Sequence, residues 1–140
     1  MNYTTNQKGL ITEMQVMLRF VEMGYDVSQP LNADCKYDCI LDVNNKLYKI
    51  QIKTAHPHPN TQNSIEIKCR STTTTRNHRK QSGYTSEDID YFATFWENEL
   101  YLIPVNECSG AKTLHLDKKI VRNNWSYLED YKAKEVLSIL

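Results

Sequence analysis

Apolar residues recur at helical spacing near the start of the chain. Most of them fall on one side of a helix that has 3.6 residues per turn. The pattern predicts a helix over about residues 7 to 23, ended by Gly24 and packed on the core through its apolar side. The apolar positions are Leu10, Ile11, Met14, Met17, Leu18 and Val21.

Further along the chain, apolar and polar residues alternate in short runs, as they do in half-buried strands. Strands are predicted over about residues 25–30, 37–43, 47–54, 64–70, 91–96 and 100–105. Residues 125–140 are predicted to be helical, and the polar, basic segment 71–83, with its four consecutive threonines, is interpreted as a mobile loop. This order predicts an α/β fold, with one domain over residues 1–140 and a central mixed β-sheet flanked by helices.

The strands on either side of Asn44 and Asn45 are predicted to form a tight hairpin, because asparagine tolerates the positive φ that such turns need. A two-residue turn places Asp38 opposite Gln51. Since side chains alternate along a strand, Asp38, Gln51 and Lys53 then share one polar face. The other face is apolar and carries Cys39, Leu41, Val43, Tyr48, Ile50 and Ile52.

A carboxylate, an amide and an ammonium on one face suit metal-assisted hydrolysis of a phosphodiester. Asp38, the amide oxygen of Gln51 and the backbone carbonyl of Ile52 offer the oxygen ligands that Mg²⁺ prefers. Glu13 could add a carboxylate from the first helix. The metal would polarise the phosphate and lower the pKa of bound water. Lys53 would position that water and offset the developing negative charge.

The sequence pattern at Gln51 and Lys53 is not specific by itself, because an acid or glutamine followed two positions later by lysine occurs five times in this chain. Gln51 and Lys53 stand out because the hairpin brings Asp38 opposite them. Glu66 and Lys68 are the alternative, since they also lie on a predicted strand, but no short turn brings an aspartate to them. A half-buried strand with a charged outer face is the favoured interpretation of that second pair.

Charge is distributed unevenly along the chain, although 17 basic and 17 acidic side chains give a formal net charge of zero. A uniformly basic nucleic-acid coat is therefore excluded. The segment from residue 68 to 80 contains basic residues and no acid. Next to a nuclease site it is interpreted as DNA-binding, because the phosphate backbone requires cationic contacts. Its basic residues are Lys68, Arg70, Arg76, Arg79 and Lys80.

The chain has neither a secretory signal pattern nor an apolar run of about 20 residues, so we expect a cytoplasmic protein without a membrane span. The cysteines, at positions 35, 39, 69 and 108, are then expected not to form disulfides. No second Cys/His pair completes a zinc site with Cys35 and Cys39. Cys39 and Cys69 alternate with apolar residues and are interpreted as small buried side chains.

Several motifs resemble a known family over about residues 5 to 116. They are Lys8-Gly-Leu-Ile-Thr-Glu13, Tyr37-Asp38, Gln51-Ile-Lys53, Gly83-Tyr-Thr-Ser-Glu-Asp-Ile-Asp-Tyr-Phe-Ala93 and Leu102-Ile-Pro-Val105. They resemble the small group I intron-encoded homing endonucleases with the PD-(D/E)XK, restriction-enzyme-like fold, in which glutamine replaces the second acid of the motif. The resemblance implies an active site of Glu13, Asp38, Gln51 and Lys53. It also implies Mg²⁺, cleavage of double-stranded DNA and self-association.

Double-strand cleavage by so small a chain predicts a homodimer or homotetramer, because one active site cuts one strand. Two alternatives stay open. The first is a junction-resolving or repair nuclease of the same fold. The second is a nuclease-fold protein that binds DNA without cutting it. Gln51 permits the second alternative, since a neutral ligand holds a metal less strongly than a carboxylate does.

Overall fold

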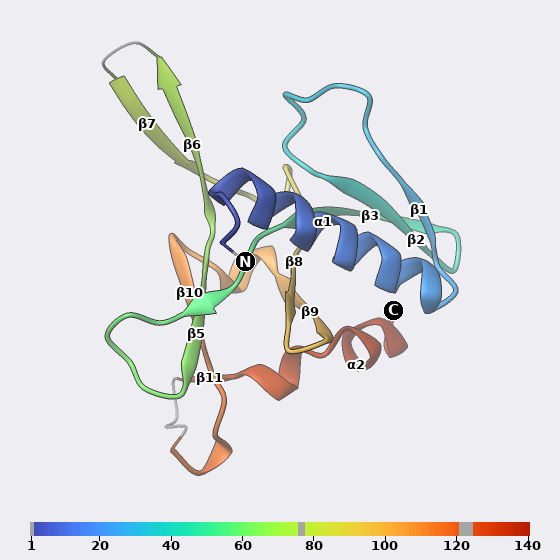
Figure 1. Cartoon of the computed structure of the whole chain (residues 1–140). Helices are drawn as coiled ribbons and strands as arrows, with labels where there is room; N and C mark the ends of the chain where they lie inside the picture. Colours follow the sequence, from blue (N-terminus) through green and yellow to red (C-terminus); the bar gives the residue numbers. More distant parts are fainter. Residues whose placement is uncertain (1, 76–77, 121–124) are drawn as a thin grey trace.

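A five-stranded mixed sheet forms the centre of the fold, with helices against one face and a second sheet against the other (Figure 1). The computed structural model describes residues 2–75, 78–120 and 125–140, and it describes only the backbone of residues 72–75, 78–81 and 120. Among these residues, no helix has both the length and the apolar character needed to cross a membrane.

The central sheet has the strand order β1-β2-β3-β8-β9. Its strands are β1 (Asp26–Ser28), β2 (Cys39–Val43), β3 (Lys46–Ile52), β8 (Tyr91–Trp96) and β9 (Glu99–Pro104). β3 and β8 pair in parallel, and the other neighbours pair antiparallel. A parallel pair needs a long crossover between its strands, and in this chain residues 53–90 form that crossover.

The second sheet has the order β11-β10-β5-β4. Its strands are β4 (His56–Pro57), β5 (Ser64–Lys68), β10 (Ala111–His115) and β11 (Ser126–Tyr127). The sequence patterns do not predict β10 or β11. The tail, expected to be helical throughout, starts with β11 and continues as the 3-10 helix η3 (Leu128–Tyr131) and the helix α2 (Ala133–Ser138). Two further 3-10 helices are η1 (Val105–Glu107) and η2 (Lys118–Ile120).

Alternation along β8 and β9 creates two separate cores. Ala93 and Leu102 join the core beneath α1 (Thr5–Glu22) and α2, together with the apolar face of the β2–β3 hairpin. Phe92 and Ile103, which are their neighbours along the strands, join the core beneath the second sheet. Each of these four side chains is fully buried. The part of the sheet formed by β8 and β9 is therefore covered on both faces.

The segment 71–83, expected to be a mobile loop, instead belongs to a two-stranded hairpin. Its strands are β6 (Arg70–Thr75) and β7 (His78–Gly83), paired from Arg70 opposite Gly83 to Thr75 opposite His78. The run of threonines explains the difference, because β-branched residues favour extended backbone. Polarity favours a loop where apolar alternation is lacking, but it does not oppose an extended backbone.

Helix α1 (Thr5–Glu22) forms where it was expected, but it presents the opposite face to the sheet. Its buried residues are Thr12, Val16 and Phe20. The predicted core-facing stripe lies mostly in solvent, which corrects the sequence-based assignment. Both faces of this helix are apolar, so periodicity alone could not choose between them. The exposed stripe consists of Leu10, Met14, Leu18 and Val21, which are 56%, 61%, 60% and 57% exposed.

Cys69 and Cys108 are joined by a disulfide, which corrects the expectation that the cysteines stay unpaired. Cys69 follows β5, and Cys108 follows η1. The two residues are 39 positions apart in sequence, so no local pattern reveals the pair. Cys39 is a free, buried thiol, as predicted, and burial raises its pKa to about 12.

Candidate active site

A two-residue turn sets the geometry of the candidate site. Asn44 and Asn45 both have positive φ, 54° and 70°, as predicted for a tight hairpin turn. The resulting register pairs Cys39 with Ile50 and Val43 with Lys46, which confirms the predicted alignment of the two strands. The apolar side chains of this hairpin lie in the core beneath α1. A slip of one residue would move those side chains to the other face, so the core itself holds the register.

Asp38 lies immediately before β2, beside the end of β3. Its backbone N–H donates to the carbonyl of Ile50 at 2.8 Å, and its carboxylate oxygen Oδ2 accepts from the N–H of Ile52 at 2.7 Å. Burial raises the pKa of the Asp38 carboxyl, and the Ile52 N–H and the Lys53 ammonium partly offset that rise. The carboxylate is therefore held in place on β3 while it retains the desolvated character of an active-site group.

Glu13 comes from α1 and faces the same site. The Thr12 hydroxyl lies 3.0 Å from the Thr54 hydroxyl, and this contact ties α1 to the chain just after β3. Burial raises the pKa of Glu13, and the charge of Asp38 raises it further. Repulsion of this kind acts only over a short range, so Glu13 lies within electrostatic reach of Asp38.

Gln51 is oriented by its neighbours. The hydrogen-bonding pattern places its amide nitrogen 2.7 Å from the Lys36 carbonyl oxygen and 3.3 Å from Asp38 Oδ2, so the amide donates to both. In this orientation the amide nitrogen, rather than the oxygen, faces the carboxylate. Direct coordination of a cation shared with Asp38 would require the amide to rotate by about half a turn.

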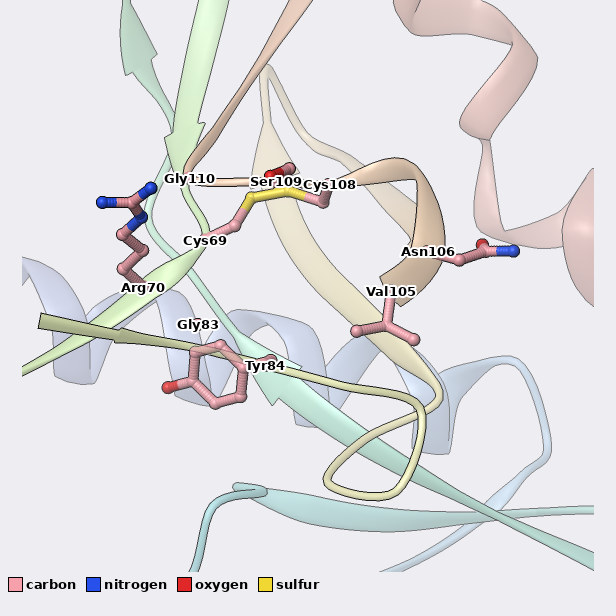
Figure 2. Close-up of a pocket in the computed structure, with 9 residues that line it drawn as sticks. All are labelled: Cys69, Arg70, Gly83, Tyr84, Val105, Asn106, Cys108, Ser109 and Gly110. Atoms are coloured by element: carbon pink, nitrogen blue, oxygen red, sulfur yellow. A yellow bond between two sulfur atoms is a disulfide. The ribbon is translucent and has the colours of Figure 1, made fainter.

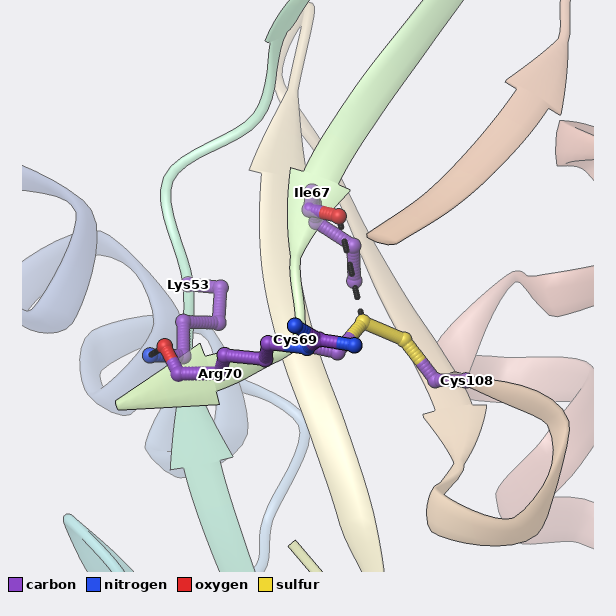
Figure 3. The surroundings of a disulfide bond; sticks show 5 residues. All are labelled: Lys53, Ile67, Cys69, Arg70 and Cys108. Atoms are coloured by element: carbon purple, nitrogen blue, oxygen red, sulfur yellow. Dashed lines mark hydrogen bonds between the residues drawn. A yellow bond between two sulfur atoms is a disulfide. The ribbon is translucent and has the colours of Figure 1, made fainter. Parts of the chain in front are cut away.

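Lys53 extends from the end of β3 into contacts with the crossover segment. Its ammonium nitrogen Nζ donates to the carbonyl of Arg70 at 3.3 Å and lies 5.3 Å from the centre of the Tyr84 ring (Figure 3 shows the Arg70 contact). Burial lowers the pKa of Lys53, and the charge of Asp38 partly restores it. Tyr84 belongs to this site, although sequence reasoning missed it, because a lone tyrosine after a polar segment carries no signal.

A pocket of about 510 Å³ lies next to the Cys69–Cys108 disulfide (Figure 2). Its walls include Arg70 and Tyr84, the two residues that Lys53 contacts, and the Cys69–Cys108 disulfide. The guanidinium of Arg70 lies against Gly110: a Cβ atom added there would stand 3.2 Å from Arg70 Nη2. The pocket thus shares Arg70 and Tyr84 with the surroundings of Lys53, although Lys53 itself does not line it.

The predicted DNA-binding residues all lie within the crossover segment between β3 and β8. Lys68 ends β5 and is exposed, and Arg70 begins β6 and is exposed. Arg79 and Lys80 belong to β7, where they pair with Thr74 and Thr73 of β6. Arg76 lies outside the described residues.

The donor set at Asp38 fits a hard cation. The carboxylates of Asp38 and Glu13 and the nearby backbone of Ile52 supply oxygen ligands, and a cation would relieve the repulsion that raises the pKa of Glu13. Among the described residues, no group of three or more His, Cys, Asp and Glu side chains is arranged to hold a metal ion. A cation at this site would therefore keep several waters, as Mg²⁺ commonly does.

Comparison with known proteins places this geometry in a family. A model of the PD-(D/E)XK endonuclease family matches residues 3–134. The chain is similar to the structure of a bacterial homing endonuclease, I-Ssp6803I, with a TM-score of 0.76 and 26% identity, covering 98% of this chain and 94% of that one. It is also 24% identical over 112 residues to Protein 5.3 of Escherichia phage T7, covering 79% of this chain and 89% of that protein. The matches confirm the predicted restriction-endonuclease-like α/β fold.

Proposed function

Because the chain belongs to the PD-(D/E)XK endonuclease family, it is a phosphodiester-cleaving nuclease, and we propose that it is a Mg²⁺-dependent DNA endonuclease. We propose site-specific cleavage of both strands, of the homing-endonuclease type. The similarity to I-Ssp6803I supports this specificity class. The observation that carries the proposal is the convergence of two half-buried carboxylates and a half-buried ammonium at the end of β3.

In this proposal Asp38, Glu13 and the Ile52 carbonyl hold Mg²⁺, with Gln51 as a further ligand if its amide rotates. Bound Mg²⁺ would polarise the scissile phosphate and favour ionisation of the attacking water. Gln51 in its present orientation donates to Asp38 and keeps the carboxylate in place.

Lys53 is the group that would meet the negative charge developing on the phosphate. Its contacts with the Arg70 carbonyl and the Tyr84 ring direct the ammonium while leaving part of its hydrogen-bonding capacity for substrate. Partial burial strengthens its interaction with an anion, because the surroundings screen charge less than water does.

Double-stranded DNA is the proposed substrate, bound by the basic residues at and beyond the end of β5. Lys68 and Arg70 flank Cys69 at the point where β5 gives way to the β6–β7 hairpin, and both are exposed. Arg79 and Lys80 on β7 and Arg76 complete the proposed contact set. Residues 1–140 are proposed to act as one nuclease domain within a homodimer or homotetramer, so that two active sites address the two strands.

The test is incubation of the protein with Mg²⁺ and long duplex DNA, with Lys53→Ala and Lys68→Ala as matched variants. Discrete double-strand fragments that require Lys53 support the proposal. Cutting confined to branched DNA favours a junction-resolving or repair nuclease of the same fold. Binding without cutting on any substrate favours a non-cleaving DNA-binding protein, an outcome for which Gln51 gives the physical reason. If Lys53→Ala cleaved normally while Lys68→Ala did not, the proposed site would be the wrong one.

A further inference from the structure

The pocket next to the disulfide has a cation in its wall and no acid. Of the described residues that line it, Arg70 is the charged one. Glu107 stands in the chain between two lining residues, but it lines a different pocket, where its Oε1 accepts a hydrogen bond from the Tyr131 hydroxyl at 2.8 Å. A cavity of about 510 Å³ with a guanidinium and no carboxylate favours an anionic ligand.

The backbone of Arg70 is fixed on both sides of the residue. Cys69, just before it, is joined to Cys108 by the disulfide and donates its N–H to the Gly110 carbonyl at 2.8 Å. Arg70 itself is paired across the β6–β7 hairpin, and its carbonyl accepts from Lys53 Nζ at 3.3 Å. The root of the arginine side chain is therefore held in a defined place relative to the Lys53 ammonium.

The guanidinium of Arg70 lies against Gly110, where the lack of a side chain makes room for it (Figure 2). A Cβ atom at Gly110 would stand 3.2 Å from Arg70 Nη2 and 3.3 Å from Arg70 Nε, which is tighter than ordinary van der Waals contact. Among the described residues, no salt bridge involves Arg70, and its hydrogen bonds use only its backbone. The guanidinium donors are therefore available to a ligand.

Ser109 adds a hydroxyl to the same wall of the pocket. It precedes Gly110 in the chain, is exposed, and has no side-chain hydrogen-bond partner in the part of the chain that the structure describes. Asn106 also lines the pocket, but its amide extends away from Arg70 in Figure 2 and is not counted as a ligand group. A planar fork of donors with a hydroxyl nearby suits a phosphate group, which accepts bidentate hydrogen bonds from arginine.

We propose that this pocket binds a phosphate adjacent to the scissile phosphate on the same DNA strand. The inference rests on the proposed function, since it needs a scissile phosphate at Lys53. Tyr84 supports the placement, because its ring lies 5.3 Å from Lys53 Nζ and also lines the pocket. Arg70 links the two positions, with its carbonyl on the ammonium and its guanidinium at the pocket. Since phosphate contacts fix the register of a nucleic acid, the pocket determines which phosphodiester meets Lys53.

Mapping of the cut positions on an end-labelled duplex that wild type cuts tests this inference. Arg70→Lys keeps the charge but loses the planar fork, so cuts should spread to neighbouring phosphodiesters, and kcat/KM at the original position should fall about tenfold. The matched control is Lys68→Ala, which removes an exposed cation that does not line the pocket and should weaken binding without moving the cut. Unmoved cuts in Arg70→Lys overturn the inference. So does an unmoved cut that loses a preference for one base, which would make Arg70 a base contact.

Gly110→Ala tests the packing of the guanidinium. The added methyl group should displace the guanidinium and spread the cuts, as Arg70→Lys does. Gly24→Ala is the matched control, because Gly24 also has a positive φ, 93° against 75° at Gly110, with no atom within 4 Å of an added Cβ. Thermal unfolding should show a similar loss of stability in both variants, since the backbone strain is alike. The same cut pattern in both glycine variants would contradict the inference.

Binding of inorganic phosphate separates this inference from the proposed function, because it requires no cleavage. Sodium phosphate should shift the backbone amide resonances of Ser109 and Gly110 in NMR spectra of the full chain, with a dissociation constant of about millimolar order. Sodium chloride at equal ionic strength should not, and Arg70→Ala should weaken the effect at least about tenfold. If wild type shows the shifts but cuts no DNA, the proposed function fails and the pocket remains an anion site. If wild type cuts DNA without these shifts, only the pocket inference fails.

Discussion

Two strands of this protein carry a glutamine or glutamate with a lysine two positions later, and their surroundings differ. On β3, Gln51 donates to Asp38 and the Lys53 ammonium reaches the Arg70 carbonyl. This pair stands beside half-buried carboxylates whose charge is not neutralised by a salt bridge among the described residues. It therefore retains groups that can act on a bound phosphate.

On β5, the glutamate is already engaged. Glu66 Oε1 lies 3.1 Å from His56 Nε2, and Glu66 Oε2 lies 3.4 Å from His58 Nε2. Lys68 is exposed at the end of the strand. The Glu66 pair fits the written motif better than Gln51 and Lys53 do, yet both of its carboxylate oxygens face cross-strand partners. The contrast teaches that the neighbours of a motif, more than its letters, determine whether its groups are available for chemistry.

The largest difference in cleavage rate between the β3 and β5 regions is expected when one carboxylate charge is removed from each. Asp38→Asn should lower the rate of Mg²⁺-dependent cleavage by about 10²–10³-fold or more, because the site loses its central anionic oxygen. Glu66→Gln should leave cleavage within a few-fold while lowering the free energy of unfolding by about 1–2 kcal/mol through its two histidine contacts. Plasmid nicking and urea unfolding measure the two effects. Equal losses of cleavage would erase the distinction between the strands.

Gln51→Glu should make the first region resemble the motif of the second. A carboxylate in place of the amide would face the Lys36 carbonyl and the Asp38 carboxylate, so the metal-free protein should lose about 1–2 kcal/mol of stability. Added negative charge should lower the Mg²⁺ concentration for half-maximal effect by about tenfold. Thermal unfolding over a Mg²⁺ titration measures this Mg²⁺ concentration without relying on cleavage activity. A higher Mg²⁺ requirement than wild type would contradict the proposed ligand set.

A smaller change, a few-fold loss of DNA affinity, is expected from Lys68→Ala. The lysine is exposed beyond the β5 glutamate, where it can contact a phosphate without touching the reacting groups. Binding should weaken uniformly across DNA sequences, and the slope of log affinity against log salt should fall by about 0.9. Fluorescence anisotropy at several salt concentrations measures it. An unchanged slope, or a loss of cleavage with binding intact, would place Lys68 in a different role.

The smallest expected effect is on the pH dependence of folding stability, and it comes from His115 in β10 of the second sheet. His115 is 5% exposed, and burial, followed by the charge of His58, lowers its pKa. The unfolded chain titrates near about pH 6.5, so on acidification the unfolded state takes up a proton that the folded state resists. Stability from this group is full above about pH 6.5 and is lost as pH falls below it.

The ring of His115 stacks on that of Trp125 with the ring centres 4.4 Å apart, so the His115→Phe variant keeps an aromatic ring in this stack and removes the titration. Its Tm should fall less than that of wild type between about pH 7 and about pH 5, by a few degrees. The Nδ1 atom of His115 is buried without a hydrogen-bond partner among the described residues, so the variant should also be no less stable than wild type near neutral pH. Scanning calorimetry at matched pH values checks both statements, and identical pH profiles would exclude His115 as the source.

The hairpin that carries Asp38 and Gln51 could be predicted because two independent signals agree on it. The Asn44–Asn45 turn sets the pairing, and the alternating apolar residues accept only one register. The fold class followed from the same kind of local pattern. The position of Glu13 on the first helix was also predicted, but from packing of the stripe that proves to be exposed, so its place near Asp38 does not follow from that reasoning.

Other features depend on contacts distant in sequence, so local patterns could not reveal them. Tyr84 joins the site only because the crossover returns to β3. Cys69 meets Cys108 through the arrangement of β5 and η1. The buried face of α1 depends on which apolar stripe the sheet accepts, and both stripes have helical spacing. The 71–83 segment lacked the apolar alternation on which strand prediction relies.

The bond from Lys53 to the Arg70 carbonyl joins the central sheet to the root of the β6–β7 hairpin (Figure 3). Through this hydrogen bond, a movement of the hairpin changes the position of the Lys53 ammonium. Displacement of its root by about 1 Å would break a 3.3 Å hydrogen bond. Shortening or stiffening the hairpin would therefore change the position of the Lys53 ammonium as well as the contacts with DNA. The first change would lower kcat, and the second would raise Kd.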